Sequence, residues 1–168
     1  MKMRGAQDAT FARLVEEHGP MLARFAASFE RNRHAREDLL QDILLGVWQA
    51  LPAFRGDASL KTYILGVAHR RCASHVMREV AQPRHEELDD EWVDGQPGPE
   101  ALAGLNQQQA RLLSALRDLP VGQRQLVVLA LEDLRYDEIA DLLGITVGNV
   151  GVRLNRARAA LREQLEEP

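Results

Sequence analysis

The side chains of this sequence best suited to binding chemistry lie near its C-terminal end, at helical spacing. At about 100° per residue, Asn149, Arg153 and Arg156 share one side of a helix, and Arg158 and Arg162 extend a basic edge. Arginine and asparagine form paired hydrogen bonds with guanine and adenine edges, and arginine also holds phosphates. The pattern predicts a DNA-binding helix, although an ordinary solvated face can also carry several arginines.

The residues before this helix could position it in a groove of DNA. Residues 136–143 are predicted to form a short helix, and residues 146–165 a longer one. Gly144 suits the left-handed conformation that ends a helix, and Thr146 is a good N-cap for the next one. The apolar residues of the short helix, expected to face inward, are Ile139, Ala140 and Leu143. A short helix that braces a second one across a glycine turn is typical of the helix-turn-helix.

A predicted helix over residues 35–51 has a second unusual face. Its expected buried side consists of Leu40, Ile43, Leu44, Val47 and Leu51. The opposite side consists of Asp38, Asp42, Leu45 and Gln49, with Gln41 and Trp48 at its edge. Acids interspersed with leucine and tryptophan favour a docking surface for a basic helical partner. A surface face with a stray leucine and a half-buried tryptophan is the alternative interpretation.

A glycine-containing loop, FRGDAS at residues 54–59, leads into a basic helix that carries Tyr63 and His69. A basic helix with an aromatic residue beside a polar loop is typical of proteins that bind unstacked single-stranded DNA. The same composition also occurs in ordinary surface loops.

The sequence offers little for catalysis or for metal binding. His69, Cys72 and His75 are three residues apart, but a metal site needs more ligands than these, and Cys72 is the single cysteine. No phosphate-cradling glycine loop, nucleophile elbow or matched carboxylate pair occurs. We therefore expect a protein without a metal or another cofactor, and not an enzyme.

Charge divides the chain into three parts. Residues 1–80 carry 12 basic and 9 acidic side chains, residues 81–105 carry 1 and 7, and residues 106–168 carry 8 and 9. The middle part, rich in proline and glycine, is predicted to be an acidic flexible linker. It separates two expected domains, 1–80 and 106–168. The chain has no run of 18 apolar residues and no apolar N-terminal stretch, so we expect a cytoplasmic protein without membrane insertion.

The remaining periodic segments also predict helices. They cover residues 10–18, then 21–29 after a break at Gly19-Pro20, then 59–80, 107–116 and 121–132. No segment alternates with the period of a strand. The predicted fold is therefore all-α, with two small helical domains joined by the linker and a helix-turn-helix in the C-terminal domain.

Two stretches of the chain together resemble a known family. They are AREDLLQDILLGVWQALPAFRGDASLKTYILGVAHRR and LPVGQRQLVVLALEDLRYDEIADLLGITVGNVGVRLNRARAALRE. In this order, with an acidic linker between them, they resemble the extracytoplasmic-function sigma factors of the sigma-70 family. The resemblance covers nearly the whole chain. It implies a factor that directs core RNA polymerase to specific promoters and assists promoter opening.

The resemblance also implies roles for particular residues. The core-polymerase-binding helix, which docks the clamp helices of the largest subunit, contains Asp38, Gln41, Asp42, Leu45 and Trp48. The candidates for contact with the melted minus-ten element are Arg55, Asp57, Ser59, Lys61, Tyr63 and His69. The candidates for reading the minus-thirty-five element are Thr146, Asn149, Arg153 and Arg156. The C-terminal domain is expected to contact the polymerase flap, and an anti-sigma factor is a further partner that the family suggests.

Some residues depart from the family pattern. Tyr63 replaces a common tryptophan, Gly151 stands where a basic residue is frequent, and Arg135 stands where a serine N-cap is usual. These departures bear on the promoter sequence. Two other functions stay open at this point: a stand-alone DNA-binding regulator, which would leave the acidic face unexplained, and an adaptor that binds polymerase but not DNA.

Overall fold

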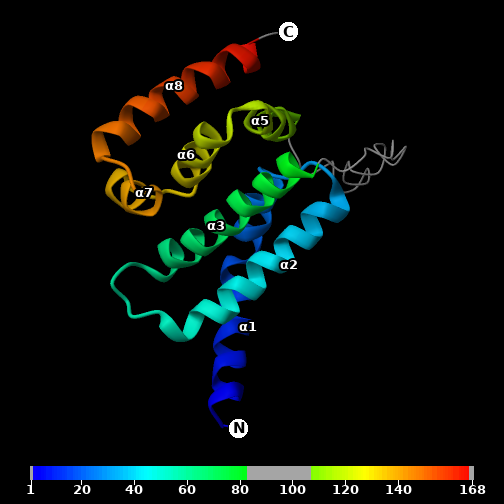
Figure 1. The fold of residues 1–168 in the computed structure, drawn as a ribbon, viewed down its shortest axis with the longest axis vertical. Coiled ribbons are helices and arrows are strands. Elements are labelled where there is room, and N and C mark those ends of the chain that lie inside the picture. Colours follow the sequence, from blue (N-terminus) through cyan, green and yellow to red (C-terminus); the bar gives the residue numbers. More distant parts are fainter. Residues whose placement is uncertain (1, 83–106, 167–168) are drawn as a thin grey trace.

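The computed structural model of the chain describes residues 2–82 and 107–166, and in these ranges every regular element is a helix (Figure 1). The first range contains α1 (Lys2–Ala27), α2 (Arg33–Ala50), the short 3-10 helix η1 (Leu51–Ala53) and α3 (Leu60–Ala81). The second contains α5 (Gln107–Asp118), α6 (Val121–Leu131), α7 (Tyr136–Leu143) and α8 (Val147–Glu166). The predicted all-α fold is confirmed. Apart from Ala81 and Gln82, the predicted linker lies outside the described residues and that prediction stays open.

Helix α1 corrects one prediction. It continues through Gly19 and Pro20, where the sequence indicated a break. Proline cannot bond the carbonyl one turn earlier, and an interior proline costs a helix about 3 kcal/mol. Tertiary packing offsets this cost, because the helix buries apolar side chains on both sides of the proline: Leu14, Met21, Leu22 and Phe25.

Helices α2 and α3 cross closely, with α1 packed against both. The buried residues of α2 are Ala35, Leu39, Ile43, Gly46 and Val47. The predicted side was therefore wrong in part: Leu39 is buried, whereas Leu40, Leu44 and Leu51 are half-buried. A Cβ at Gly46 would lie 3.1 Å from Val67 Cγ1 of α3. The absence of a side chain at Gly46 is what lets the two helices approach.

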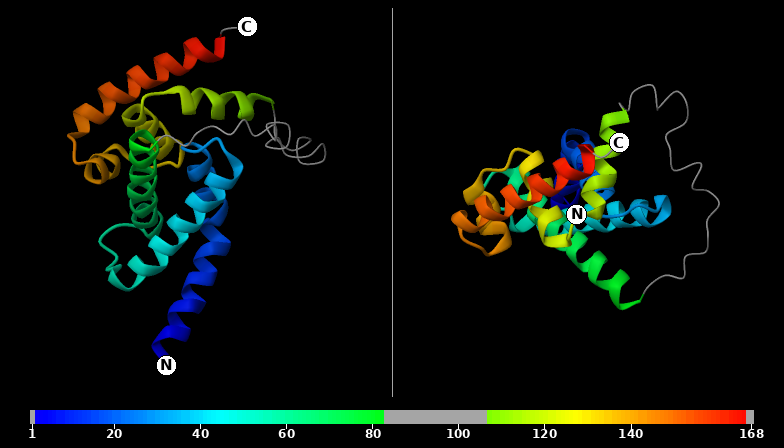
Figure 2. Two further views of the ribbon diagram at one scale, coloured as in Figure 1. Left: turned by 45° about the vertical axis from the view of Figure 1, so that its right-hand side comes forward. Right: turned by 90° about the horizontal axis from the view of Figure 1, so that it is seen from above.

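In the C-terminal half, α5, α6 and α7 pack around one side of α8. The largest fully buried side chains at this junction are Leu126, Leu129, Ile139, Val150 and Leu154. Figure 1 and Figure 2 show α8 on the outer side of this group, away from α1 and α2. Its opposite side is therefore left open to solvent.

The buried residues of the two halves form one continuous cluster. Polar contacts at its edge join them: Arg24 pairs with Glu132 at 3.1 Å, and Arg117 Nε donates to the Ala27 carbonyl at 2.8 Å. Burial and the nearby guanidinium groups lower the pKa of Arg117 to about 10. None of the described helices is both long and apolar enough to cross a bilayer.

Candidate functional site

The turn between α7 and α8 is built as its sequence predicts. Gly144 has a φ of 65°, and the Ile145 amide donates to the Ala140 carbonyl at 3.1 Å. Thr146 Oγ1 accepts a hydrogen bond from the Asn149 amide at 3.2 Å, so Thr146 is the N-cap of α8. Ile139 and Ala140 are buried and Leu143 is half-buried. These features fix the angle between α7 and α8.

At the start of α7, where the family usually has a serine N-cap, Arg135 is the N-cap residue. Arginine has no acceptor to offer the helix amides, so the side chain of Arg135 cannot cap them. Instead, the side chain of the third helical residue bonds to the backbone of the N-cap residue. Glu138 Oε2 accepts a hydrogen bond from the Arg135 backbone amide at 2.9 Å. The Arg135 guanidinium instead binds Asp137 at 3.0 Å. An acid at the third helical position thus supplies half of a capping box.

The outward side of α8 is a basic surface whose arginines are not paired with acids in the part of the chain that the structure describes. Asn149, Arg153 and Arg156 are all exposed. Helix α8 carries four arginines: Arg153, Arg156, Arg158 and Arg162. None of them forms an ion pair or a hydrogen bond with another described residue. An arginine whose five donors face solvent can bind phosphates or base edges without first breaking an internal contact.

The loop before α3 is held at both ends. At its start, the rings of Phe54 and Tyr63 lie 5.1 Å apart, and the Tyr63 hydroxyl donates to the Ala50 carbonyl at 2.8 Å. At its end, Ser59 Oγ accepts from the Thr62 amide at 3.0 Å and caps α3. Tyr63 and Ser59 therefore position the loop, because their polar atoms already have partners.

The other predicted loop residues differ in accessibility. Arg55 and Asp57 are exposed on either side of Gly56, whose φ is 82°. Lys61 is half-buried on the first turn of α3. His69 lies two turns further along, and its Nδ1 is buried with no hydrogen-bond partner among the described residues. Burial, reinforced by Arg70, lowers the pKa of His69 and favours its neutral form.

On α2, the predicted docking face contains both free and occupied side chains. Asp38 and Gln41 are exposed, and Leu45 is 51% exposed. Asp42 instead binds Arg71 Nη1 at 3.2 Å, and Trp48 Nε1 donates to Asp8 at 3.2 Å. The free part of the face is therefore Asp38, Gln41 and Leu45.

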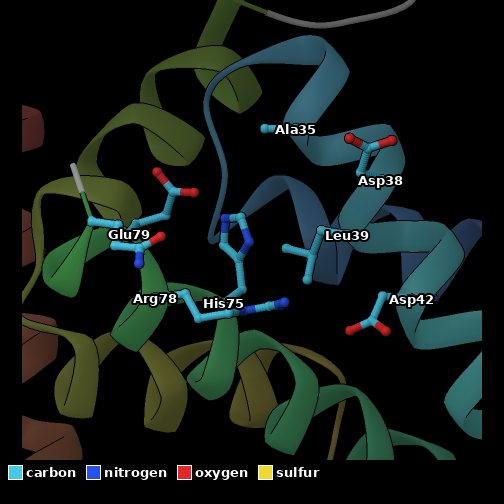
Figure 3. Close-up of a pocket in the computed structure, with 8 residues that line it drawn as sticks. Ala35, Asp38, Leu39, Asp42, His75, Arg78 and Glu79 are labelled. Carbon is cyan, nitrogen blue, oxygen red and sulfur yellow. The ribbon is translucent and has the colours of Figure 1, made fainter. Parts of the chain in front are cut away.

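A cleft of about 450 Å³ lies beside this face, between α2 and α3. Figure 3 shows Asp38 and Asp42 along its α2 side and His75 with Glu79 on its α3 side. His75 Nε2 lies 2.7 Å from a carboxylate oxygen of Glu30. Arg78 also lines the cleft, so its charge is mixed.

Among the polar contacts that the sequence did not predict, two join residues of the proposed surfaces to partners far along the chain. Arg71, which binds Asp42, lies 29 positions along the chain from it. Thr62 Oγ1 donates to Glu138 Oε1 at 2.8 Å across 76 positions. Contacts at such separations follow from the packing of α2 against α3 and of α3 against α7.

The histidines and cysteine of α3 do not form a metal site. Cys72 is fully buried, and burial together with the charge of Asp42 raises the pKa of its thiol. Among the described residues, no three histidine, cysteine or carboxylate side chains lie close enough to hold a metal ion.

The capped glycine turn, the bracing α7 and the open basic side of α8 define a protein of the helix-turn-helix class. Comparison with known families is more specific. The model of the family described as Sigma-70 region 2 matches residues 14–81, and that of Sigma-70, region 4 matches residues 101–161. The chain belongs to the extracytoplasmic-function sigma factors of the sigma-70 family. It is thus an RNA polymerase sigma factor, a transcription initiation factor that directs polymerase to promoters.

Characterised relatives agree over most of their length. The RNA polymerase sigma factor CnrH of Cupriavidus metallidurans is 31% identical, over 93% of this chain and 86% of the relative. The ECF RNA polymerase sigma factor RpoE of Cereibacter sphaeroides is 30% identical, over 94% of this chain and 87% of the relative.

Solved structures share the fold. The structure of CnrH in complex with the cytosolic domain of CnrY matches with a TM-score of 0.67 and 27% identity, covering 95% of this chain and 89% of that one. The structure of RpoE from Bartonella quintana in complex with the anti-sigma factor NepR matches with a TM-score of 0.73 and 25% identity. It covers 94% of this chain and 98% of that one.

Proposed function

We propose that the N-terminal helices dock this factor on core polymerase through the exposed part of α2. Asp38, Gln41 and Leu45 form that surface, and the cleft beside it extends it toward α3. An apolar side chain beside an exposed acid and an amide suits a basic helical partner, such as the clamp helices of the polymerase's largest subunit. Asp42 and Trp48 support this surface through Arg71 and Asp8.

The loop over residues 54–59 is proposed to bind the melted minus-ten element. Arg55 and Asp57 are the side chains free to contact bases or phosphates there. Ser59 and Tyr63 hold the ends of the loop, and Lys61 lies at the start of α3. Binding energy gained on a base outside the stack offsets part of the cost of unpairing it.

Helix α8 is proposed to enter the major groove of the minus-thirty-five element. The single observation that carries this role is its set of solvent-facing arginines, with no acidic side chain among them, beside a capped helix-turn-helix. Asn149, Arg153 and Arg156 are placed to reach DNA, and Thr146 holds the start of the helix. The same domain is proposed to contact the polymerase flap.

We propose that residues 1–80 dock on polymerase and open the promoter. Residues 106–168 recognise the upstream element, and the acidic residues 81–105 connect the two. Two modest DNA contacts held on one polymerase gain specificity through their effective concentration. On this proposal the factor works in the cytoplasm, catalyses no covalent chemistry and needs no cofactor.

An anti-sigma factor is a proposed further partner. The solved structure of the Bartonella RpoE contains the anti-sigma factor NepR, and that of CnrH contains the cytosolic domain of CnrY. A protein that covers the exposed part of α2 or α8 would keep this factor from polymerase or DNA.

Run-off transcription with core polymerase tests the proposal, with the factor's own upstream region as template. A transcript that depends on the added protein is the expected result. Binding to polymerase without a transcript from any template would favour the adaptor. Specific duplex binding without any affinity for polymerase would favour the stand-alone regulator and overturn the docking role of α2.

A further inference from the structure

Before Glu163, the centre of the open side of α8 is formed by small and apolar residues. The buried stripe consists of Val150, Leu154, Ala157 and Leu161. At about 100° per residue, the side chains farthest from this stripe are those of Gly148, Val152, Ala159 and Glu163. Asn155 and Arg156 lie on either side of this line. The predicted Arg153 and Arg156 lie on one side of that line, and Arg158 and Arg162 lie on the other. The middle of the solvent-facing side is thus Val152.

Val152 is 52% exposed, although the same helix buries Val150 completely. A single exposed apolar side chain is common on protein surfaces and needs no special cause. Valine is nevertheless a poor choice for an exposed helix position, because its branched Cβ restricts the rotamers a helix allows. The residues around Val152 indicate what this exposed valine can bind.

Those surroundings allow a close approach to DNA. A Cβ added at Gly148, one turn before Val152, would meet no atom within 4 Å. Asn155 and Arg156, about one turn after it, are exposed, and neither forms a hydrogen bond or an ion pair with another described residue. The major groove is about 12 Å wide, close to the diameter of a helix with its side chains. Small residues on the groove side would let Val152 reach the floor of the groove while the arginines reach its walls.

We propose that Val152 contacts the C5-methyl group of a thymine in the minus-thirty-five element and helps to specify that base. The methyl group is the apolar feature that distinguishes thymine in the major groove, and apolar side chains read it by direct contact. This inference rests on the proposed entry of α8 into the major groove. On this proposal, Val152 makes the groove contact of α8 specific for one base pair.

Deoxyuridine substitution tests the contact, because uracil differs from thymine only by the missing methyl group. Holoenzyme is formed from core polymerase and the full-length factor. Its affinity is measured for a promoter duplex in which each thymine of the upstream element, on either strand, is replaced in turn. At one position the wild-type factor is expected to lose about three- to tenfold in affinity, the scale of burying one methyl group.

The factor carrying Val152→Ala is expected to bind the unmodified promoter with a similar loss and to show no further loss with deoxyuridine at that position. Val152→Ile, which keeps the apolar contact, retains the dependence on the methyl group. Leu131→Ala is the matched control, because Leu131 is 53% exposed but lies on α6. It is expected to retain the full deoxyuridine effect.

Two results would overturn the inference while leaving the proposed function intact. One is promoter binding that no deoxyuridine substitution weakens. The other is a deoxyuridine effect of equal size in the wild type and in Val152→Ala. A wild-type holoenzyme that bound the promoter no better than a scrambled duplex would instead overturn the groove contact of α8, and this inference with it.

Discussion

Thr62 on α3 donates its hydroxyl hydrogen to the carboxylate of Glu138 on α7, with 2.8 Å between the oxygens. Thr62 follows the loop proposed to bind the minus-ten element, and α7 braces the helix proposed to read the minus-thirty-five element. Leu142 of α7 packs onto the same part of α3, because a Cβ at Gly66 would lie 2.8 Å from its Cδ2. Both halves of the factor therefore meet at a contact adjacent to both proposed DNA surfaces.

The Thr62–Glu138 contact predicts how stability depends on pH. Hydrogen bonds from the Arg135 amide and from Thr62 hold the pKa of Glu138 below its ordinary value of 4.5. A carboxyl whose pKa is lower in the folded state stabilises the fold above its unfolded-state pKa. That contribution is lost as the pH falls through the folded-state pKa. The effect is small, because the Glu138 side chain is 23% exposed and solvent screens it.

Glu138→Gln is expected to lower the free energy of unfolding by about 0.5–1 kcal/mol at pH 7. The difference from the wild type should shrink below pH 4.5. Urea denaturation at a series of pH values measures it, with Asp141→Asn, an exposed acid on the same helix, as the control. A constant difference at every pH would show that the carboxylate charge contributes nothing.

The proposed docking face predicts the effect of reversing one charge. Asp38→Arg is expected to weaken binding to core polymerase by about tenfold or more, because like charges in an interface are costly. Its unfolding midpoint should not change, since Asp38 is exposed. Asp42→Arg is a poorer test, because it would also replace the partner of Arg71 with a second cation.

Glu16→Arg is the matched control for polymerase binding: it makes the same change in charge at an exposed position of α1. A pull-down titration with core polymerase compares the two variants. Equal affinities of Asp38→Arg and the wild type would remove Asp38 from the docking surface.

Arg156→Ala separates base reading from phosphate binding. If Arg156 reads a base, the variant loses about 1–3 kcal/mol on the cognate upstream element and little on other sequences. If it holds a phosphate, the loss is the same on every sequence, and the salt dependence of binding falls by about one ion. We expect the first pattern, because Arg156 is near the centre of the open side of α8. Binding by holoenzyme to cognate and scrambled elements over a range of salt concentrations distinguishes the two, with Arg13→Ala, on α1, as the control.

The thiol of Cys72 is predicted to be unreactive in the native protein. It is completely buried, and burial with the nearby Asp42 charge raises its pKa, so almost no thiolate forms at neutral pH. A thiol reagent such as DTNB should label it only at the rate at which α3 opens. Ser74→Cys places a thiol at an exposed position of the same helix and should react at once. Rapid labelling of the wild type without denaturant would mean that α3 opens readily.

The fold was predictable from sequence wherever local chemistry decides it. Residues 136–143 form the predicted helix, Gly144 adopts the predicted left-handed conformation, and Thr146 forms the predicted cap. Each depends on residues within one or two turns. The prediction failed at Pro20, where packing of α1 against its neighbours outweighs the local cost of a proline inside a helix.

The candidate surfaces were predicted only in outline. A helical wheel places Asp42 and Trp48 on one face but cannot show that Arg71 and Asp8 already bind them. Likewise, Tyr63 was predicted from its aromatic ring, whereas its hydroxyl is engaged by Ala50. The exposure of Val152 could not be predicted from its residue type, because most valines of a helix are buried. Partners distant in the chain are set by the tertiary fold, which no local pattern encodes.

Tyr63→Phe tests whether this residue positions the loop or stacks on a base. The substitution removes the hydroxyl bonded to the Ala50 carbonyl and keeps the ring that lies against Phe54. If Tyr63 stacked on an unpaired base, phenylalanine would preserve promoter opening, because stacking needs only the ring.

If the hydroxyl fixes the end of α2 relative to α3, the variant should open the promoter several-fold more slowly. It should also lose about 0.5–1.5 kcal/mol of stability. Permanganate reactivity of the melted thymines in holoenzyme complexes measures opening, and recognition of the upstream element should be unchanged.

Tyr136→Phe is the control for stability, because the Tyr136 hydroxyl forms no hydrogen bond with another described residue. Because Tyr63 is half-buried and its hydroxyl already has a partner, we expect slow opening. Wild-type opening rates in Tyr63→Phe would assign the residue to base stacking instead.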